Sequence, residues 1–161
     1  MAALLTTIGK GPARDEWVPV LELADEPEPL RRCLHDGVLY GVVDDASRKR
    51  LGAVLVVERD TRTVELRAVA VTEDEQRQGL GTWMVGEVCA RLRAEDKAIV
   101  VGTASSGIRQ LAFYQRLGFR MTHVERDFFT AERGYPAGLE ENGIPTRDMV
   151  WLRAEPPGDP A

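Results

Sequence analysis

The sequence contains little of what metal sites, disulfide frameworks and membrane segments require. Only Cys33 and Cys89 occur, with no CxxC pair, and there are only two histidines. This composition supports neither a disulfide framework nor a zinc site, so we expect no bound metal and a reducing, cytoplasmic environment. No run approaches the roughly 18 consecutive apolar residues of a membrane span, and no basic segment precedes an apolar one at the N-terminus. We therefore expect no membrane partner and no targeting segment.

Basic residues are also outnumbered. There are 21 Lys and Arg against 26 Asp and Glu, a net charge of −5, and the longest basic run is residues 48–50. A nucleic acid is not expected as the main partner, because a polyanion would be repelled. With 161 residues, 43% of them hydrophobic and 29% charged, the chain has the composition of one globular domain. We expect this domain over residues 1–152 and a disordered tail over residues 153–161.

Hydrophobic periodicity predicts a mixture of strands and helices. The predicted helices are residues 28–35, residues 79–95 and a segment from residue 108 that stops at Gly118. The predicted strands are residues 17–23, 38–44, 51–58, 64–71, 98–104, 119–129 and 146–152. Three of these strands follow one another with short polar turns, which indicates an antiparallel meander. The order favours an α/β (α+β) fold with a mixed, mostly antiparallel central sheet and helices on both faces.

The most informative segment is a strand, a loop and a helix that begins at paired glycines, Gly79 and Gly81. The start of a helix exposes unpaired N–H groups and the positive end of the helix dipole, which together attract phosphate. Glycine lets a diphosphate approach the backbone, and Arg77 adds a cation. By itself the pattern is equally consistent with a glycine-rich turn that only starts a helix. A dinucleotide fingerprint fits poorly, because it would need glycine at Met84.

Two motifs together resemble the GNAT acetyltransferases. Residues 76–81 (QRQGLG) are similar to the pyrophosphate signature of that family, and residues 111–119 (LAFYQRLGF) to its second motif. The resemblance covers residues 38–152, and residues 141–149 resemble a bacterial subgroup of unassigned substrate. It implies a GNAT-like sheet, acetyl-CoA as the co-substrate, and an enzyme of the acyltransferase class.

The resemblance also implies which residues bind the co-substrate. The backbone N–H groups from Arg77 to Thr82 would hold the CoA diphosphate, and the strand before them would pair with the pantetheine arm. The Val69 N–H is the expected donor to the oxyanion. The cofactor-binding residues expected in this way are Val69, Val71, Gln76, Arg77, Gln78, Gly79, Leu80, Gly81 and Thr82.

Tyr114 is the candidate general acid, because the matching tyrosine of the family lies near the cofactor sulfur. A thiolate with a pKa of about 8.5 can take a proton from a tyrosine with a pKa of about 10 at a cost of about 2 kcal/mol. The alternative is a core aromatic whose hydroxyl is satisfied by a neighbour.

Glu65 is the candidate general base, because the sequence from Glu65 to Gln76 resembles histone-type members with a glutamate base at this position. An extended strand rises about 3.3 Å per residue, so Glu65 and Val69 would lie roughly 13 Å apart. Ordered water would have to carry the proton over that distance. A plain exposed carboxylate on the sheet is an equal alternative.

Other chemistry-bearing residues are expected to be structural. His123 has a suitable pKa for a base, but a single histidine in a strand is more often structural. Cys89, Trp83 and Met84 are expected in the core. Arg147 and Asp148 would serve either strand pairing or the acceptor pocket. The carboxylates of the long loop at residues 130–145 would suit a cationic acceptor, and a solvated surface loop is equally consistent with its sequence.

The expected function is acetyl-CoA-dependent N-acetylation, by direct transfer to a primary amine of a small molecule or peptide. The alternative is a non-catalytic regulatory module that binds acyl-CoA. Two departures from the family keep this alternative open: Gly107 replaces a frequent asparagine, and the N-terminal helical region is short. An edge strand at residues 146–152 could pair between two copies, which would make a homodimer.

Overall fold

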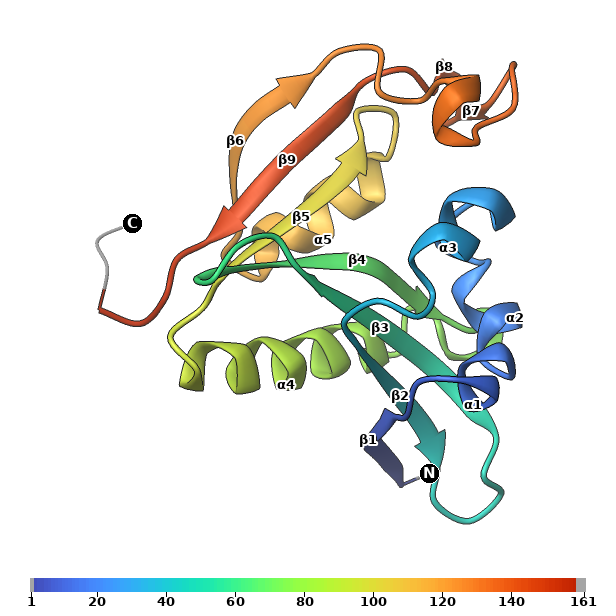
Figure 1. Ribbon diagram of the computed structural model, residues 1–161, viewed down its shortest axis with the longest axis vertical. Helices are drawn as coiled ribbons and strands as arrows, with labels where there is room; N and C mark the ends of the chain where they lie inside the picture. The colour runs from blue at the N-terminus through green and yellow to red at the C-terminus, as the bar shows by residue number, and fades with distance from the viewer. Residues whose placement is uncertain (1, 159–161) are drawn as a thin grey trace.

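The computed structural model describes residues 2–158, which form a seven-stranded sheet with short helices and one long helix around it (Figure 1). The strand order is β1-β2-β3-β4-β5-β9-β6. Only β4 and β5 pair in parallel, and every other neighbouring pair is antiparallel. The expected mixed, mostly antiparallel sheet is therefore confirmed. The strands are β1 (Ala3–Ile8), β2 (Val38–Asp44), β3 (Arg50–Glu58), β4 (Thr63–Val71), β5 (Ala98–Ala104), β6 (Arg120–Glu125) and β9 (Met149–Ala154).

Helices cover both faces of this sheet, as the sequence predicts. One apolar cluster joins α4 (Leu80–Ala94) and α5 (Ile108–Arg116) to one face. A second cluster joins the short helices α2 (Val18–Leu21) and α3 (Pro27–Cys33) to the other. The turn α1 (Pro12–Asp15) lies beside them in Figure 1. Two 3-10 turns, η1 (Glu73–Glu75) and η2 (Ala131–Arg133), and a small hairpin, β7 (Glu140–Glu141) with β8 (Ile144–Pro145), complete the elements.

The N-terminal region differs from the sequence prediction. Residues 17–23 are not a strand: Val18–Leu21 is a helical turn, with Pro19 in its first turn, where proline is tolerated. Trp17, Val20 and Leu21 bury their side chains against the sheet from there. The strand β1, which the sequence analysis did not predict, pairs antiparallel with β2 at the sheet edge. Residues 3–8 of β1 are all half-buried or exposed, so the strand has no clear alternation of buried and exposed side chains.

The C-terminal strand also differs from expectation. β9 lies between β5 and β6, so the expected edge strand at residues 146–152 is wrong, and the route to a dimer through it is lost. Edge positions belong to β1 and β6. The strand continues to Ala154, which pairs with Ile99, so the first residues of the expected tail are ordered. Residues 159–161 of that tail lie outside the described residues.

The long helix α4 buries most of the residues that its periodicity marks. Leu80, Met84, Val88 and Leu92 recur every four residues and face the core. Trp83, expected in the core, is 38% exposed, because it lies beside that stripe. Met84 is fully buried, as expected.

The strand β4 contains a bulge that decides where its side chains point. Leu55 pairs with Ala68 and Val56 with Leu66, which leaves Arg67 without a partner on β3. Before the bulge, Leu66 belongs to the cluster on the α4 face. After it, Ala68 belongs to the cluster with α2. Glu65, one residue before Leu66, therefore faces the side of α3.

Candidate active site

An opening forms in the middle of the sheet where β4 and β5 separate. Their parallel pairing stops at Glu65 and Val100, and a cavity of about 700 Å³ begins beyond this point. The cavity is lined by β4, by the start of α4 and by α5. Four of its lining residues, Arg67, Arg77, Arg109 and Arg116, carry guanidinium groups. An anionic ligand of elongated shape fits such a lining.

The glycine motif forms the start of α4, as the sequence predicts. Gly79 is the N-cap with a φ of 84°, and Arg77 has a φ of 63°. The first backbone bond of the helix runs from Trp83 N–H to the Gly79 carbonyl at 3.0 Å. The N–H groups of Leu80, Gly81 and Thr82 thus lack a partner one turn earlier, and the helix dipole makes this end attractive to phosphate.

Two of the expected cofactor-binding side chains stabilise the turn before this helix. Gln76 Nε2 donates to the Val71 carbonyl at 2.9 Å, and Gln78 Nε2 donates to the Asp74 carbonyl at 2.9 Å. These bonds fix the loop that carries Arg77. The side chains of Gln76 and Gln78 therefore shape the loop, which leaves the backbone as the main donor set.

The edge of β4 that faces the opening offers further backbone groups, although the Val71 carbonyl already accepts from Gln76 Nε2. Thr72 N–H donates to the Leu51 carbonyl on β3 at 2.9 Å. Because backbone groups of successive strand residues point to opposite sides, those of Val71 and Val69 point away from β3, toward the opening. Both residues line the larger cavity. This placement suits an extended ligand arm that pairs with the strand.

Tyr114 lies on α5 and lines the larger cavity while being almost fully buried. Its ring packs edge to face against Phe113 at 5.0 Å and Phe119 at 5.7 Å. Burial, with a smaller effect of Cys89, raises the pKa of Tyr114 above its ordinary value. The phenol is therefore protonated at neutral pH and has its proton available to donate.

A second cavity of about 500 Å³ lies on the α3 side of β4. Its charged lining consists of Arg32, Arg59, Arg67 and Arg133 with Glu65 and Glu125. Aromatic residues Phe128, Tyr135 and Trp151 form much of the remainder. Arg67 lines both cavities, so the two spaces adjoin at this residue.

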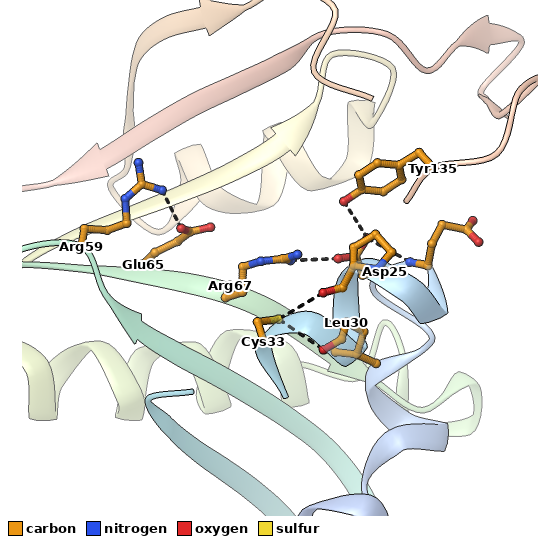
Figure 2. Close-up of polar contacts among 9 residues, drawn as sticks. Asp25, Leu30, Cys33, Arg59, Glu65, Arg67 and Tyr135 are labelled. Carbon is orange, nitrogen blue, oxygen red and sulfur yellow. Dashed lines mark hydrogen bonds and ion pairs between the residues drawn. The ribbon is translucent and has the colours of Figure 1, made fainter. Parts of the chain in front are cut away.

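Asp25 and Tyr135 form a hydrogen-bonded network that holds Arg67 in place (Figure 2). Arg67 Nη1 donates to Asp25 Oδ2 at 2.8 Å, and the Tyr135 hydroxyl donates to Asp25 Oδ1 at 3.0 Å. Burial acts to lower the pKa of Arg67, but its interactions with Cys33 and Asp25 outweigh this effect and raise the pKa. The guanidinium is thus permanently charged at the point where the cavities meet.

Glu65 lies in the smaller cavity with a side chain that is only 11% exposed. Its Oε1 accepts a hydrogen bond from Arg59 Nη1 at 2.8 Å, as Figure 2 shows. The Arg59 guanidinium also lies over the Trp151 ring, 5.2 Å from its centre. The alternative of an exposed carboxylate on the sheet is therefore not what the structure shows.

The other residues singled out in the sequence have structural surroundings. His123 lies on the edge strand β6, stacked on Trp151 and in hydrogen-bond distance of Thr122. Cys89 is half-buried in α4, and burial raises its pKa to about 11. Asp148 accepts a hydrogen bond from the Asp127 N–H, which braces the loop after β6.

The long loop approaches the smaller cavity with a cation and a phenol. Arg133 and Tyr135 line the cavity, while Glu132, Glu140 and Glu141 are not among its lining residues. The loop therefore contributes no carboxylate to it, contrary to the expected contacts with a cationic acceptor. Its hairpin is tied to the start of α5, because Asn142 Nδ2 donates to the Ser106 carbonyl at 2.8 Å.

Several lining residues were not found by the sequence analysis. Arg67 could have been found, since it is two residues from Glu65 and strand alternation places both on one face. Arg59, and Asp25 which holds Arg67 without lining a cavity, come from separate regions, and no local pattern marks them. Arg133 and Tyr135 belong to the loop at residues 130–145, which the sequence singles out as a possible binding segment. The described residues contain no group of three or more His, Cys, Asp or Glu side chains that could hold a metal ion, and no helix among them could cross a membrane.

A sheet that opens between β4 and β5, a helix start with unpaired N–H groups and a second, adjoining cavity are together consistent with proteins that bind an acyl-CoA. The model of the acetyltransferase (GNAT) family matches residues 11–119. The chain is 35% identical, over 142 residues, to the uncharacterized N-acetyltransferase YvbK of Bacillus subtilis, a match that covers 86% of this chain and 88% of that relative. The chain belongs to the GNAT acetyltransferase family.

Solved structures support the same conclusion and identify the co-substrate. A GNAT family acetyltransferase from Elizabethkingia anophelis with acetyl-CoA bound superposes with a TM-score of 0.84 and 30% identity, covering 95% of this chain and 97% of that one. A Bacillus subtilis acetyltransferase in complex with CoA gives a TM-score of 0.83 and 30% identity, covering 96% and 99%. Acetyl-CoA is the co-substrate of the family, and the lining of the larger cavity fits it.

Proposed function

We propose that this protein is an N-acetyltransferase that transfers the acetyl group of acetyl-CoA directly to a primary amine of a small molecule or peptide. The observation that carries this proposal is the meeting of two cavities at Arg67. The larger cavity has the donors that a CoA needs. The smaller cavity gives a separate acceptor access to the same point, which a module that only binds acyl-CoA would not require.

The residues that would hold acetyl-CoA follow from the larger cavity. The N–H groups at the start of α4 would bind the diphosphate, with Arg77 beside them. The outward backbone groups of Val69 and Val71 would pair with the pantetheine arm. When bound, acetyl-CoA supplies a thioester whose carbonyl carbon accepts the amine. The Val69 N–H would stabilise negative charge on the carbonyl oxygen.

Tyr114 would donate a proton to the leaving sulfur. Its raised pKa makes the phenol a weaker acid than free tyrosine, which increases the cost of proton transfer. The same burial would raise the pKa of a thiolate beside it, so the two changes partly cancel. A positioned general acid contributes about a hundredfold or more to a rate.

Glu65 would accept the proton that the amine must lose. An alkylammonium with a pKa of about 10.4 is neutral in about one molecule in a thousand near pH 7, a cost of roughly 4 to 5 kcal/mol. The Glu65 Oε1 is engaged by Arg59, which leaves Oε2 as the oxygen for a proton or an ordered water. The carboxylate faces the acceptor cavity, where the amine would arrive.

The test measures thiol release from acetyl-CoA with a panel of primary amines, and mass spectrometry of the acetylated products. Amine-dependent release above the rate without protein is the expected result. Tight binding of acetyl-CoA, with no release on any amine, would instead support the acyl-CoA-binding module. The binding measurement also shows that the protein used is folded.

A further inference from the structure

The charged lining of the smaller cavity is dominated by guanidinium groups. We infer that the acceptor is an amine that carries a carboxylate next to the amino group, as in an α-amino acid, and that Arg67 binds this carboxylate. The inference rests on the proposed function and adds to it the chemical class of the acceptor.

The first support is the number of guanidinium N–H donors in the lining. Four arginines and two glutamates line the cavity, although the whole chain has a net charge of −5. Both oxygens of Glu125 are already occupied, because Arg133 Nη2 donates to one at 2.9 Å and Trp151 Nε1 to the other at 3.1 Å. Glu65 is engaged by Arg59. Arg32 pairs with Glu28 and Arg67 with Asp25, so each of the four guanidinium groups has a carboxylate partner. What the lining offers in excess is N–H donors, because each arginine carries five of them.

The second support is how Asp25 uses its oxygens. Oδ1 accepts from the Tyr135 hydroxyl and from the Glu26 N–H at 2.9 Å, and Oδ2 accepts from Arg67 Nη1. Asp25 is a positioning residue, since its carboxylate holds Nη1 of Arg67 by a hydrogen bond. The Tyr135 hydroxyl also lies beside the Arg67 guanidinium. An arginine has five N–H donors in a planar fork, so Arg67 has N–H groups beyond those facing Asp25 and Tyr135 for a carboxylate of the acceptor.

The third support is the position of Arg67 at the meeting point of the two cavities. The amine must reach this point to attack the thioester in the larger cavity. A carboxylate bound to Arg67 then has to be adjacent to the amine, which is the arrangement of an α-amino acid. The rest of the acceptor would extend into the smaller cavity, against the rings of Trp151 and Phe128.

A panel of matched acceptors tests the class. The pairs are phenylalanine with phenylalaninamide, and alanine with alaninamide, and a series of glycine, β-alanine and γ-aminobutyrate varies the distance between the two groups. We expect kcat/KM to be about tenfold or more higher for each acid than for its amide, because a bidentate charge-assisted contact is lost in the amide. It should fall as the amine and carboxylate move apart.

Substitutions then link the preference to Arg67. Arg67→Gln should remove most of the preference for acid over amide, mainly through KM, while the affinity for acetyl-CoA stays within a few fold. Because this change leaves Asp25 buried and unpaired, the double variant Asp25→Asn/Arg67→Gln is the second test. The matched control is Arg62→Gln, since Arg62 is an exposed ion-pair partner of Asp96 on the surface. It should keep the preference of the unmodified protein.

The outcomes separate this inference from the proposed function. Equal rates with acids and amides, a preference for O-phosphoethanolamine over all the acids, or a double variant that keeps the acid preference would each overturn the inference alone. Absence of thiol release with every amine, while acetyl-CoA still binds, would overturn the proposed function and the inference with it.

Discussion

Arg59 Nη1 lies 2.8 Å from Glu65 Oε1, and this contact joins the segment after β3 to the middle of the sheet, on β4. The Arg59 side chain is 49% exposed, whereas that of Glu65 is 11% exposed. The guanidinium thus reaches in from the surface to a largely buried carboxylate. The Glu65 carboxylate therefore has Oε1 bound to Arg59 and keeps Oε2 for a proton from the cavity.

The base role of Glu65 predicts a change in the pH–rate profile. Glu65→Gln should remove or shift the acidic limb of kcat/KM, because that limb reports the group that must be deprotonated in the free enzyme. We expect a rate loss of about a hundredfold at neutral pH. The control is Glu58→Gln, on the exposed end of β3. An acidic limb that stays in place in Glu65→Gln would reject the assignment.

The acid role of Tyr114 predicts a loss of turnover without a loss of binding. Tyr114→Phe deletes only the hydroxyl, so the ring contacts with Phe113 and Phe119 remain. We expect kcat to fall by about a hundredfold, with the Kd for acetyl-CoA nearly unchanged in calorimetry. Tyr40→Phe is a matched control, since Tyr40 is also buried but lies on β2. If the two variants turn over equally, Tyr114 is not the acid.

We predict that replacing the glycines at the start of α4 and inside it by alanine has different effects on stability and on acetyl-CoA binding. Gly79→Ala places a side chain at a φ of 84°, which should lower the free energy of unfolding by about 1 kcal/mol and weaken acetyl-CoA binding. A Cβ at Gly81 would lie 3.6 Å from Val71 Cγ2, an ordinary contact, so Gly81→Ala should fold normally.

Gly86→Ala is the control for this series. A Cβ at Gly86 meets nothing within 4 Å, and Gly86 lies inside the helix. Replacement by alanine should raise the free energy of unfolding by about 0.5 to 1 kcal/mol without changing acetyl-CoA binding. Chemical denaturation and calorimetry measure the two quantities separately. Equal acetyl-CoA affinities in all three variants would contradict the role given to the start of α4.

We predict that Gly41 on β2 cannot be replaced without a loss of stability, because the ring of Trp17 packs against it. A Cβ at Gly41 would lie 2.6 Å from Trp17 Cζ2, in a well-packed cluster beneath α2. Gly41→Ala should therefore lower the free energy of unfolding by about 1 to 3 kcal/mol. Gly9→Ala, where a Cβ meets nothing within 4 Å, should change it by less than about 0.5 kcal/mol. Urea denaturation compares the two, and a Gly41→Ala protein as stable as Gly9→Ala would contradict this packing.

We predict that the thiol of Cys89 is alkylated slowly at mildly alkaline pH. Burial raises the pKa of this thiol to about 11. A raised pKa lowers the fraction of reactive thiolate at a given pH. At pH 8 about one Cys89 thiol in a thousand is ionised, against about a quarter for free cysteine. Burial also raises the pKa of Cys33. Iodoacetamide labelling followed by mass spectrometry should be slow at both residues in the native protein and fast in denaturant. Rapid native labelling of Cys89 would contradict its burial.

Local patterns in the sequence determined most of the secondary structure, and the resemblance of two motifs to the GNAT family indicated the co-substrate. The strand at residues 64–71, the turn through Gly79 and the amphipathic helix after it are set by alternation, glycine and a four-residue apolar repeat. Such patterns act within one or two turns of chain, so they are visible without the fold. The position of Tyr114 on a helix after the central strand was likewise readable from residues 111–119.

Only the tertiary structure decided the lining of the smaller cavity and the edges of the sheet. Trp17 to Leu21 looks like a strand, yet its apolar side chains bury as well from a helical turn. The insertion of β9 between β5 and β6 depends on pairing between distant segments. The bulge at Arg67, the carboxylate of Asp25 and the phenol of Tyr135 come from three separate regions. Their contact is a product of long-range packing, which no local period in the sequence records.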